Sequence, residues 1–71
     1  MAQKFRLHDV VALTEDVPEH GLLRGQVGTI VEILSEGHFE VEFSDDSGRA
    51  YALAPLARRQ LMVLHYQSAA A

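Results

Sequence analysis

The chain has 71 residues, a length that allows one small domain with a marginal hydrophobic core. It contains no cysteine, which excludes disulfide bonds and thiolate metal sites. Ten acidic residues against six basic ones give a net charge of -4, whereas nucleic-acid-binding proteins are usually basic, so the composition favours protein or small-molecule partners.

Turn-forming residues divide the chain into five short extended runs. The first run is followed by a polar loop with Pro18 and Gly21, which both disfavour a regular element. The third run alternates, with Phe39, Val41 and Phe43 on one side, and this predicts a strand with one buried and one wet face. The expected strands are residues 9–13, 26–34, 38–43, 49–53 and 61–65, with a single helical or 3₁₀ turn within residues 55–60.

The glycine-bracketed entry to the second run carries the strongest indication of the fold. Gly25 and Gly28 precede residues 29–33, which are rich in β-branched side chains. Glycine allows a positive φ or the close approach of another backbone, as a tightly coiled barrel requires. Barrel closure would also remove exposed strand edges. We therefore predict an all-β fold, a small five-stranded barrel over residues 1–66, with a disordered tail at residues 67–71.

The order of these elements resembles an SH3-like barrel, with a long loop after the first strand and a single turn before the last. The chain is also similar to a family of short bacterial proteins, common in cyanobacteria, that is described only as a domain of unknown function. This resemblance implies a fold over about residues 5–66 and no catalytic or binding residues. It rests on the segments at residues 9–18, 25–29, 39–43 and 61–64.

The Gly-x-Val-Gly-x-Ile pattern at residues 25–30 also resembles KOW-type ribosomal and transcription modules. The same barrel resembles small photosynthetic accessory subunits and one subunit of nitrile hydratase. Such fold analogy implies a class of protein but no function. KOW modules usually carry basic loops around the glycine, and here only Arg24 stands there, so nucleic-acid binding is the alternative interpretation. It would use Arg24, Arg49, Arg58 and Arg59.

Neither metal binding nor catalysis has a recognisable motif. The four histidines, His8, His20, His38 and His65, lack metal-ligand spacing and are interpreted as scattered surface residues. Asp45 and Asp46 lack EF-hand spacing, and a hairpin turn accounts for them. No nucleophile elbow or phosphate-binding loop is present, so we expect a protein without catalytic residues, cofactor or metal.

The acidic loop allows two interpretations. Glu15, Asp16 and Glu19 stand where some peptide-binding SH3 domains recognise basic residues beside a polyproline ligand. That recognition needs an aromatic-lined groove, and outside the core this chain offers only Tyr51 and Tyr66. The favoured interpretation is therefore that the acidic side chains keep an exposed loop soluble.

Three arginines and the apolar last strand are the candidate contacts to a partner. The arginines either bind an acidic surface or phosphate, or pair with neighbouring carboxylates on the surface. Residues 61–64 show no polar alternation, so both faces of this strand are covered within the monomer or one face meets another chain. The predicted partner-binding residues are Glu15, Asp16, Arg49, Arg58, Arg59, Met62, Leu64 and Tyr66.

Together these patterns predict a non-enzymatic protein-interaction or accessory module that binds a protein partner or associates with itself. The chain has no apolar stretch of membrane-spanning length and no visible targeting segment. We therefore expect a cytoplasmic protein without membrane contact.

Overall fold

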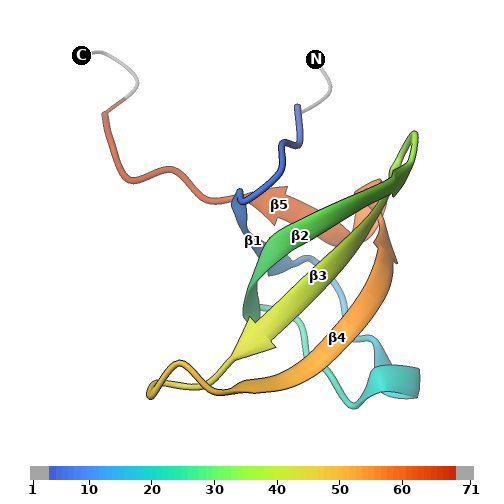
Figure 1. Ribbon diagram of the computed structural model, residues 1–71, viewed down its shortest axis with the longest axis vertical. Coiled ribbons are helices and arrows are strands. Elements are labelled where there is room, and N and C mark those ends of the chain that lie inside the picture. Colours follow the sequence, from blue (N-terminus) through green and yellow to red (C-terminus); the bar gives the residue numbers. More distant parts are fainter. Residues whose placement is uncertain (1–3, 69–71) are drawn as a thin grey trace.

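The computed structural model describes residues 4–68 as one antiparallel sheet of five strands in the order β4-β3-β2-β1-β5 (Figure 1). The predicted all-β fold is confirmed. The elements are β1 (Val10–Leu13), η1 (Pro18–His20), β2 (Val27–Ser35), β3 (His38–Ser44), β4 (Ala50–Ala57), η2 (Arg58–Gln60) and β5 (Leu61–Val63). The 3₁₀ helix η1 lies in the polar loop, where no regular element was predicted. Residues 69–71 of the predicted tail lie outside the described residues.

The sheet curls but does not close. Its edge strands β4 and β5 are joined by the three residues of η2, so the sheet bends round until one end of each edge meets the other (Figure 1). Among the described strands, however, β4 pairs with β3 alone and β5 with β1 alone. The closed barrel predicted from the sequence is therefore not formed, because β4 and β5 make no backbone ladder with each other. With only three residues, β5 is too short to continue into a second ladder.

The concave side of the curled sheet holds the hydrophobic core. Phe39, Val41 and Phe43 are buried as their alternation predicted, and the adjoining strands supply aliphatic neighbours such as Ile30 and Leu56. Among the described residues no polar or charged side chain is buried. The core is therefore stabilised by apolar burial, at about 25 cal/mol per Å² of surface removed from water.

Gly28 allows β2 and β3 to approach closely. A Cβ atom on Gly28 would lie 2.7 Å from Val41 Cγ1 and 2.8 Å from the carbonyl oxygen of Glu42. Gly25 has a φ of 92° where the loop enters β2, and its N–H donates to the carbonyl oxygen of Leu13 at 2.8 Å. Both glycines therefore play the conformational roles that the sequence predicted.

Strand β4 is longer than predicted. It continues through Pro55 to Ala57, and the 3₁₀ turn is confined to η2, whereas the sequence predicted a strand ending at residue 53. Proline is tolerated because β4 is an edge strand. Along an antiparallel strand, the backbone N–H groups point alternately toward the partner strand and away from it. The Arg58 N–H points toward the β3 side, where it donates to the carbonyl oxygen of Gly37. The nitrogen of Pro55, three residues earlier, therefore faces the open edge, where it needs no partner.

Strand β5 is shorter than predicted. It ends at Val63 rather than at residue 65. The Leu64 N–H still donates to the carbonyl oxygen of Val10 at 3.0 Å, so the chain stays attached to β1 for one more residue. Gln67 and Ser68 belong to no helix or strand.

Candidate interaction surfaces

An uncharged row of side chains crosses the convex, outer face of the sheet. Val27 on β2 lies opposite Ala12 on β1, and Ala12 lies opposite Met62 on β5. Cross-strand partners point to one face, and because Val11 and Leu13 are buried in the core, this face is the outer one. We call Val27, Ala12 and Met62 the apolar row.

The apolar row is partly open to solvent. Val27 and Met62 are each 46% exposed, whereas Ala12 between them is only 7% exposed. The next row on the same face holds Thr29, Val10 and, beyond the end of β5, Leu64, again without a charge. Beside Met62 the surface forms a hollow of about 470 Å³. It is lined by Ala12, Leu13, Thr14, Arg24, Gly25 and Met62.

The outer face changes to acidic side chains over β2 and β3. Glu32 lies directly opposite Glu40, and Glu42 follows two residues further along β3. Their partners on β4 are Pro55 opposite Glu40 and Leu53 opposite Glu42, so these rows contain no basic residue. We call Glu32, Glu40 and Glu42 the acidic strip. Like charges in directly opposed positions are unfavourable, by about 0.2–1 kcal/mol for a cross-strand pair.

The two adjacent arginines of η2 have different surroundings. The guanidinium carbon of Arg58 lies 5.1 Å from the ring centre of Phe5 and 6.0 Å from that of Phe39, so this half-buried side chain covers one end of the core. Arg59 is exposed, and its carbonyl oxygen accepts a hydrogen bond from Thr14 Oγ1 at 2.8 Å. Of the pair, Arg59 is the side chain that faces solvent.

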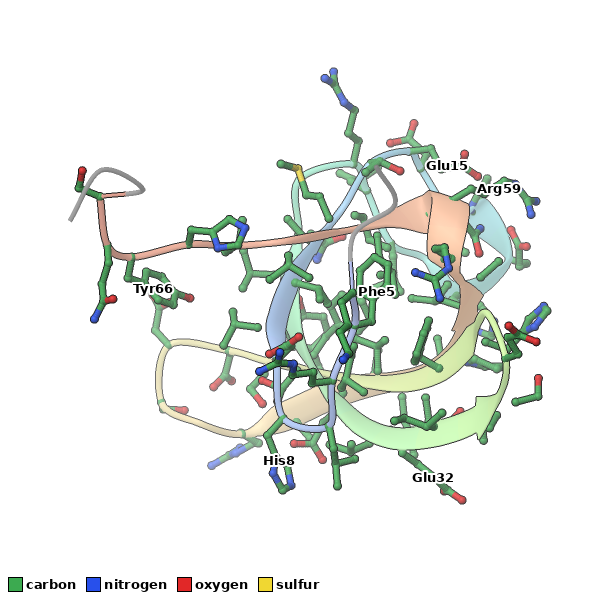
Figure 2. The ribbon with its side chains drawn as sticks, turned by 90° about the horizontal axis from the view of Figure 1, so that it is seen from above. Phe5, His8, Glu15, Glu32, Arg59 and Tyr66 are labelled. Carbon is green, nitrogen blue, oxygen red and sulfur yellow. The ribbon has the colours of Figure 1, made fainter. Side chains whose placement is uncertain are left out.

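The other predicted contacts lie apart from the apolar row. Glu15 Oε2 accepts a hydrogen bond from Gln60 Nε2 at 3.3 Å, and Asp16 Oδ1 accepts one from the Arg24 N–H at 2.8 Å. These contacts hold the acidic loop against its neighbours. Figure 2 shows Glu15 and Arg59 on one side of the molecule and Tyr66 on the other. Arg49 is exposed after the β3–β4 turn.

The structure therefore groups only part of the predicted set. Met62 and Leu64 share the outer face of the sheet, and Tyr66, 76% exposed, follows them along the chain. Arg49, Arg58, Arg59 and Glu15 are not part of this group, and Asp16 is linked to it only through its hydrogen bond with the backbone of Arg24, which lines the hollow beside Met62. Sequence reasoning missed Val27, because only the strand register places it beside Ala12 and Met62.

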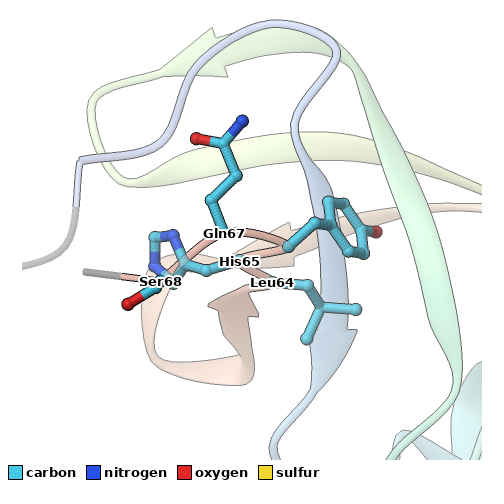
Figure 3. A pocket seen from close by; sticks show the side chains of 5 residues that line it. Leu64, His65, Gln67 and Ser68 are labelled. Carbon is cyan, nitrogen blue, oxygen red and sulfur yellow. The ribbon is translucent and has the colours of Figure 1, made fainter. Parts of the chain in front are cut away.

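The chain segment after β5 borders two further hollows. One, of about 540 Å³, lies along residues 64–68 (Figure 3). The other, of about 420 Å³, lies between this segment and the residues before β1. Within residues 4–68, no three His, Cys, Asp or Glu side chains gather to hold a metal ion, and no helix is long and apolar enough to cross a membrane.

Residues 7–63 match the family model described as Domain of unknown function (DUF4926). The chain belongs to this family. The match confirms that the sequence resembles a domain of unknown function. Searches of curated proteins and of solved structures give no significant match.

The DUF4926 match encloses all five strands. It includes the apolar row and the acidic strip, whereas Lys4, Arg6 and the segment after Val63 lie outside it. The outer face of the sheet is therefore part of the domain proper. The hollow along residues 64–68 is formed by residues that flank the domain, and the hollow of about 420 Å³ is formed in part by such residues.

Proposed function

We propose that this protein is a non-enzymatic module that binds a protein partner through the outer face of β2, β1 and β5. The observation that carries the proposal is the apolar row, in which half-exposed Val27 and Met62 flank Ala12. An uncharged face that the monomer leaves partly open is the kind of surface that a partner covers.

The acidic strip indicates the chemistry of the partner. It adjoins the uncharged rows, since Glu42 lies opposite Thr29 and Thr29 lies opposite Val10. A surface that combines apolar side chains with lysine or arginine would match both halves of this face. The opposed carboxylates of Glu32 and Glu40 would gain cationic neighbours in the complex, which offsets their repulsion in the free protein.

The proposal also covers the type of fold and the cellular location of the protein. The strand order, the long loop after β1 and the 3₁₀ turn between β4 and β5 support an SH3-like barrel whose last ladder is open. The proposal also includes a bacterial origin and a cytoplasmic accessory role, and the absence of cysteine agrees with a reducing compartment.

The test is affinity capture of partners from the native host by the full chain, with mass spectrometry to identify them. Met62→Glu places a charge in the apolar row and should abolish capture of a specific partner. Leu34→Glu is the matched control, because Leu34 on β2 is 45% exposed and lies outside the row. Both variants should keep the thermal unfolding midpoint of the parent. A partner that binds Met62→Glu as well as the parent contradicts the proposal.

Nucleic-acid binding in the manner of KOW modules has less support. Arg58 lies over Phe5, Arg24 lines the hollow beside Met62, Arg49 follows the β3–β4 turn and Arg59 lies on η2, and no described contact or hollow brings these four arginines together. Fluorescence anisotropy with generic RNA and DNA at low salt separates the two functions. Tight binding that weakens steeply with salt would favour the nucleic-acid interpretation.

A further inference from the structure

Residues from opposite ends of the chain line an open hollow of about 420 Å³ beside β5. Its lining residues are Lys4, Arg6, Asp9, Val63, Leu64 and His65. This volume falls within the range of small-molecule sites, about 300–1,000 Å³. The hollow is distinct from the apolar row and its neighbouring hollow at Met62.

The cationic side of this hollow is held in place by the core. Phe5 is 8% exposed and packs at 5.2 Å from Phe39, ring centre to ring centre. Lys4 and Arg6, on either side of Phe5, both line the hollow. A turn fixes the segment, because the Arg6 N–H donates to Asp9 Oδ2 at 2.9 Å and the Asp9 N–H donates to the Arg6 carbonyl at 3.1 Å.

The opposite side of the hollow comes from the end of β5. The hydrogen bond from the Leu64 N–H to Val10 holds this segment against β1 and places His65 next to the hollow. The lining therefore contains two cationic side chains, Lys4 and Arg6, the imidazole of His65 and a single carboxylate, Asp9, which already accepts a backbone N–H. Val63 and Leu64 supply an apolar wall.

We propose that this hollow binds the phosphate group of a small phosphate ester. Lys4, Arg6 and His65 offer donor groups from three separate side chains, which suits the three terminal oxygens of a phosphate monoester better than the two of a carboxylate. The carbon body of the ester lies against Val63 and Leu64. The site adds a small-molecule ligand to a domain whose outer face binds a protein.

The experiment follows amide chemical shifts of the full chain during titration with phenyl phosphate, inorganic phosphate or acetate at constant ionic strength. Saturable shifts are expected at Arg6, Asp9 and His65. Phenyl phosphate should bind more tightly than inorganic phosphate because its ring contacts the apolar wall, and acetate should bind more weakly than either. Arg6→Gln should weaken phenyl phosphate binding by about tenfold, since it removes a charge-assisted hydrogen bond and keeps the backbone N–H to Asp9.

Lys4→Gln provides a second variant at an exposed position, and Arg59→Gln on η2 is the matched control that should leave the affinity unchanged. Three results would overturn the proposal. Acetate could bind as tightly as the phosphates, inorganic phosphate could bind as tightly as phenyl phosphate, or Arg59→Gln could weaken binding as much as Arg6→Gln and Lys4→Gln do. None of these results bears on the apolar row, whose test uses Met62→Glu.

Discussion

Two neighbouring residues of the same type, Arg58 and Arg59, show how far local context separates their roles. The guanidinium of Arg58 lies over the ring of Phe5, a cation–π contact of the kind that contributes about 0.5–1 kcal/mol at exposed sites and more when desolvated. Arg59 points to solvent while its backbone holds Thr14. Arg58 therefore covers the core, whereas Arg59 is a surface residue. Of the two, only Arg59 has a side chain exposed as a partner contact requires.

At Gly28 the constraint is space, whereas at Gly21 it is conformation. The carbonyl oxygen of Glu42 lies within 2.8 Å of a Cβ atom at Gly28, and a backbone atom cannot rotate away. Gly21 follows η1 with a φ of 67° and has nothing within 4 Å of its Cβ position. Alanine and asparagine should therefore rank in opposite orders at the two positions. Asparagine should be the more destabilising at Gly28 and the less destabilising at Gly21.

We predict that Gly28→Ala lowers the free energy of unfolding by about 1–3 kcal/mol through overpacking, and that Gly28→Asn costs more. Gly21→Ala should cost about 1–2 kcal/mol, with Gly21→Asn milder than Gly21→Ala because asparagine tolerates the left-handed region. Urea unfolding of the four variants measures the order. A neutral Gly28→Ala would show that β2 and β3 can separate without loss of stability.

At the scale of elements, the turn between β3 and β4 is organised by one carboxylate. Asp45 Oδ1 accepts hydrogen bonds from Ser47 Oγ at 2.8 Å and from the N–H groups of Arg49 and Ser47 at 3.0 Å each. The Ser47 hydroxyl, followed by the Arg49 N–H, holds the pKa of Asp45 below its ordinary value of 3.8. The hairpin interpretation of this acidic segment therefore has a specific geometry.

Because the folded-state pKa of Asp45 is lowered, its contribution to stability is present above the ordinary value and is lost as pH falls through the folded-state value. We predict that the amide signals of Ser47 and Arg49 move together in an acid titration, with a midpoint below 3.8. Asp45→Ala should remove this shared transition, and Asp46→Asn should leave it in place. A midpoint at or above 3.8 would contradict the hydrogen-bonded turn.

The edge strand β4 is protected by its own chemistry. Pro55 offers no N–H to the open edge, and the N–H of Ala57 is taken by Gln60 Oε1 at 2.9 Å. Proline and satisfied donors on an edge discourage pairing with another chain. The free edge of β4 near Pro55 and Ala57 is therefore poorly suited to pairing with a strand of another chain. The outer face of the sheet remains the more favourable contact surface.

At the scale of the whole molecule, charge and apolar surface are separated on one face. The apolar row lies over β2, β1 and β5, and the acidic strip lies over β2 and β3. Two copies meeting face to face would bring two negatively charged molecules together, each with a net charge of -4. A basic partner meets no such repulsion, which favours it over a second copy.

We therefore predict that the isolated chain sediments as a monomer at moderate ionic strength. Met62→Glu should leave its sedimentation coefficient unchanged, and so should the matched Leu34→Glu. Analytical ultracentrifugation over a concentration series gives the measurement. A dimer that Met62→Glu alone dissociates would show that a second copy covers the apolar row.

The sequence by itself determined the local features of this protein. Alternation at Phe39, Val41 and Phe43 predicted the core side of β3, and Gly28 predicted the close approach of strands, because each signal is carried by neighbouring residues. The sequence predicted the positions of the strand ends less accurately. Strand β4 ran on through Pro55, since the position of a strand at the edge of a sheet decides whether proline is tolerated.

Only the tertiary structure decided which distant residues share a surface. Val27, Ala12 and Met62 form one row through two strand registers, and Lys4 and His65 line one hollow because β5 pairs with β1. A shift of one residue in either register would turn the row to the other face. Register depends on long-range packing and turn geometry, so both candidate surfaces become visible in the folded chain alone.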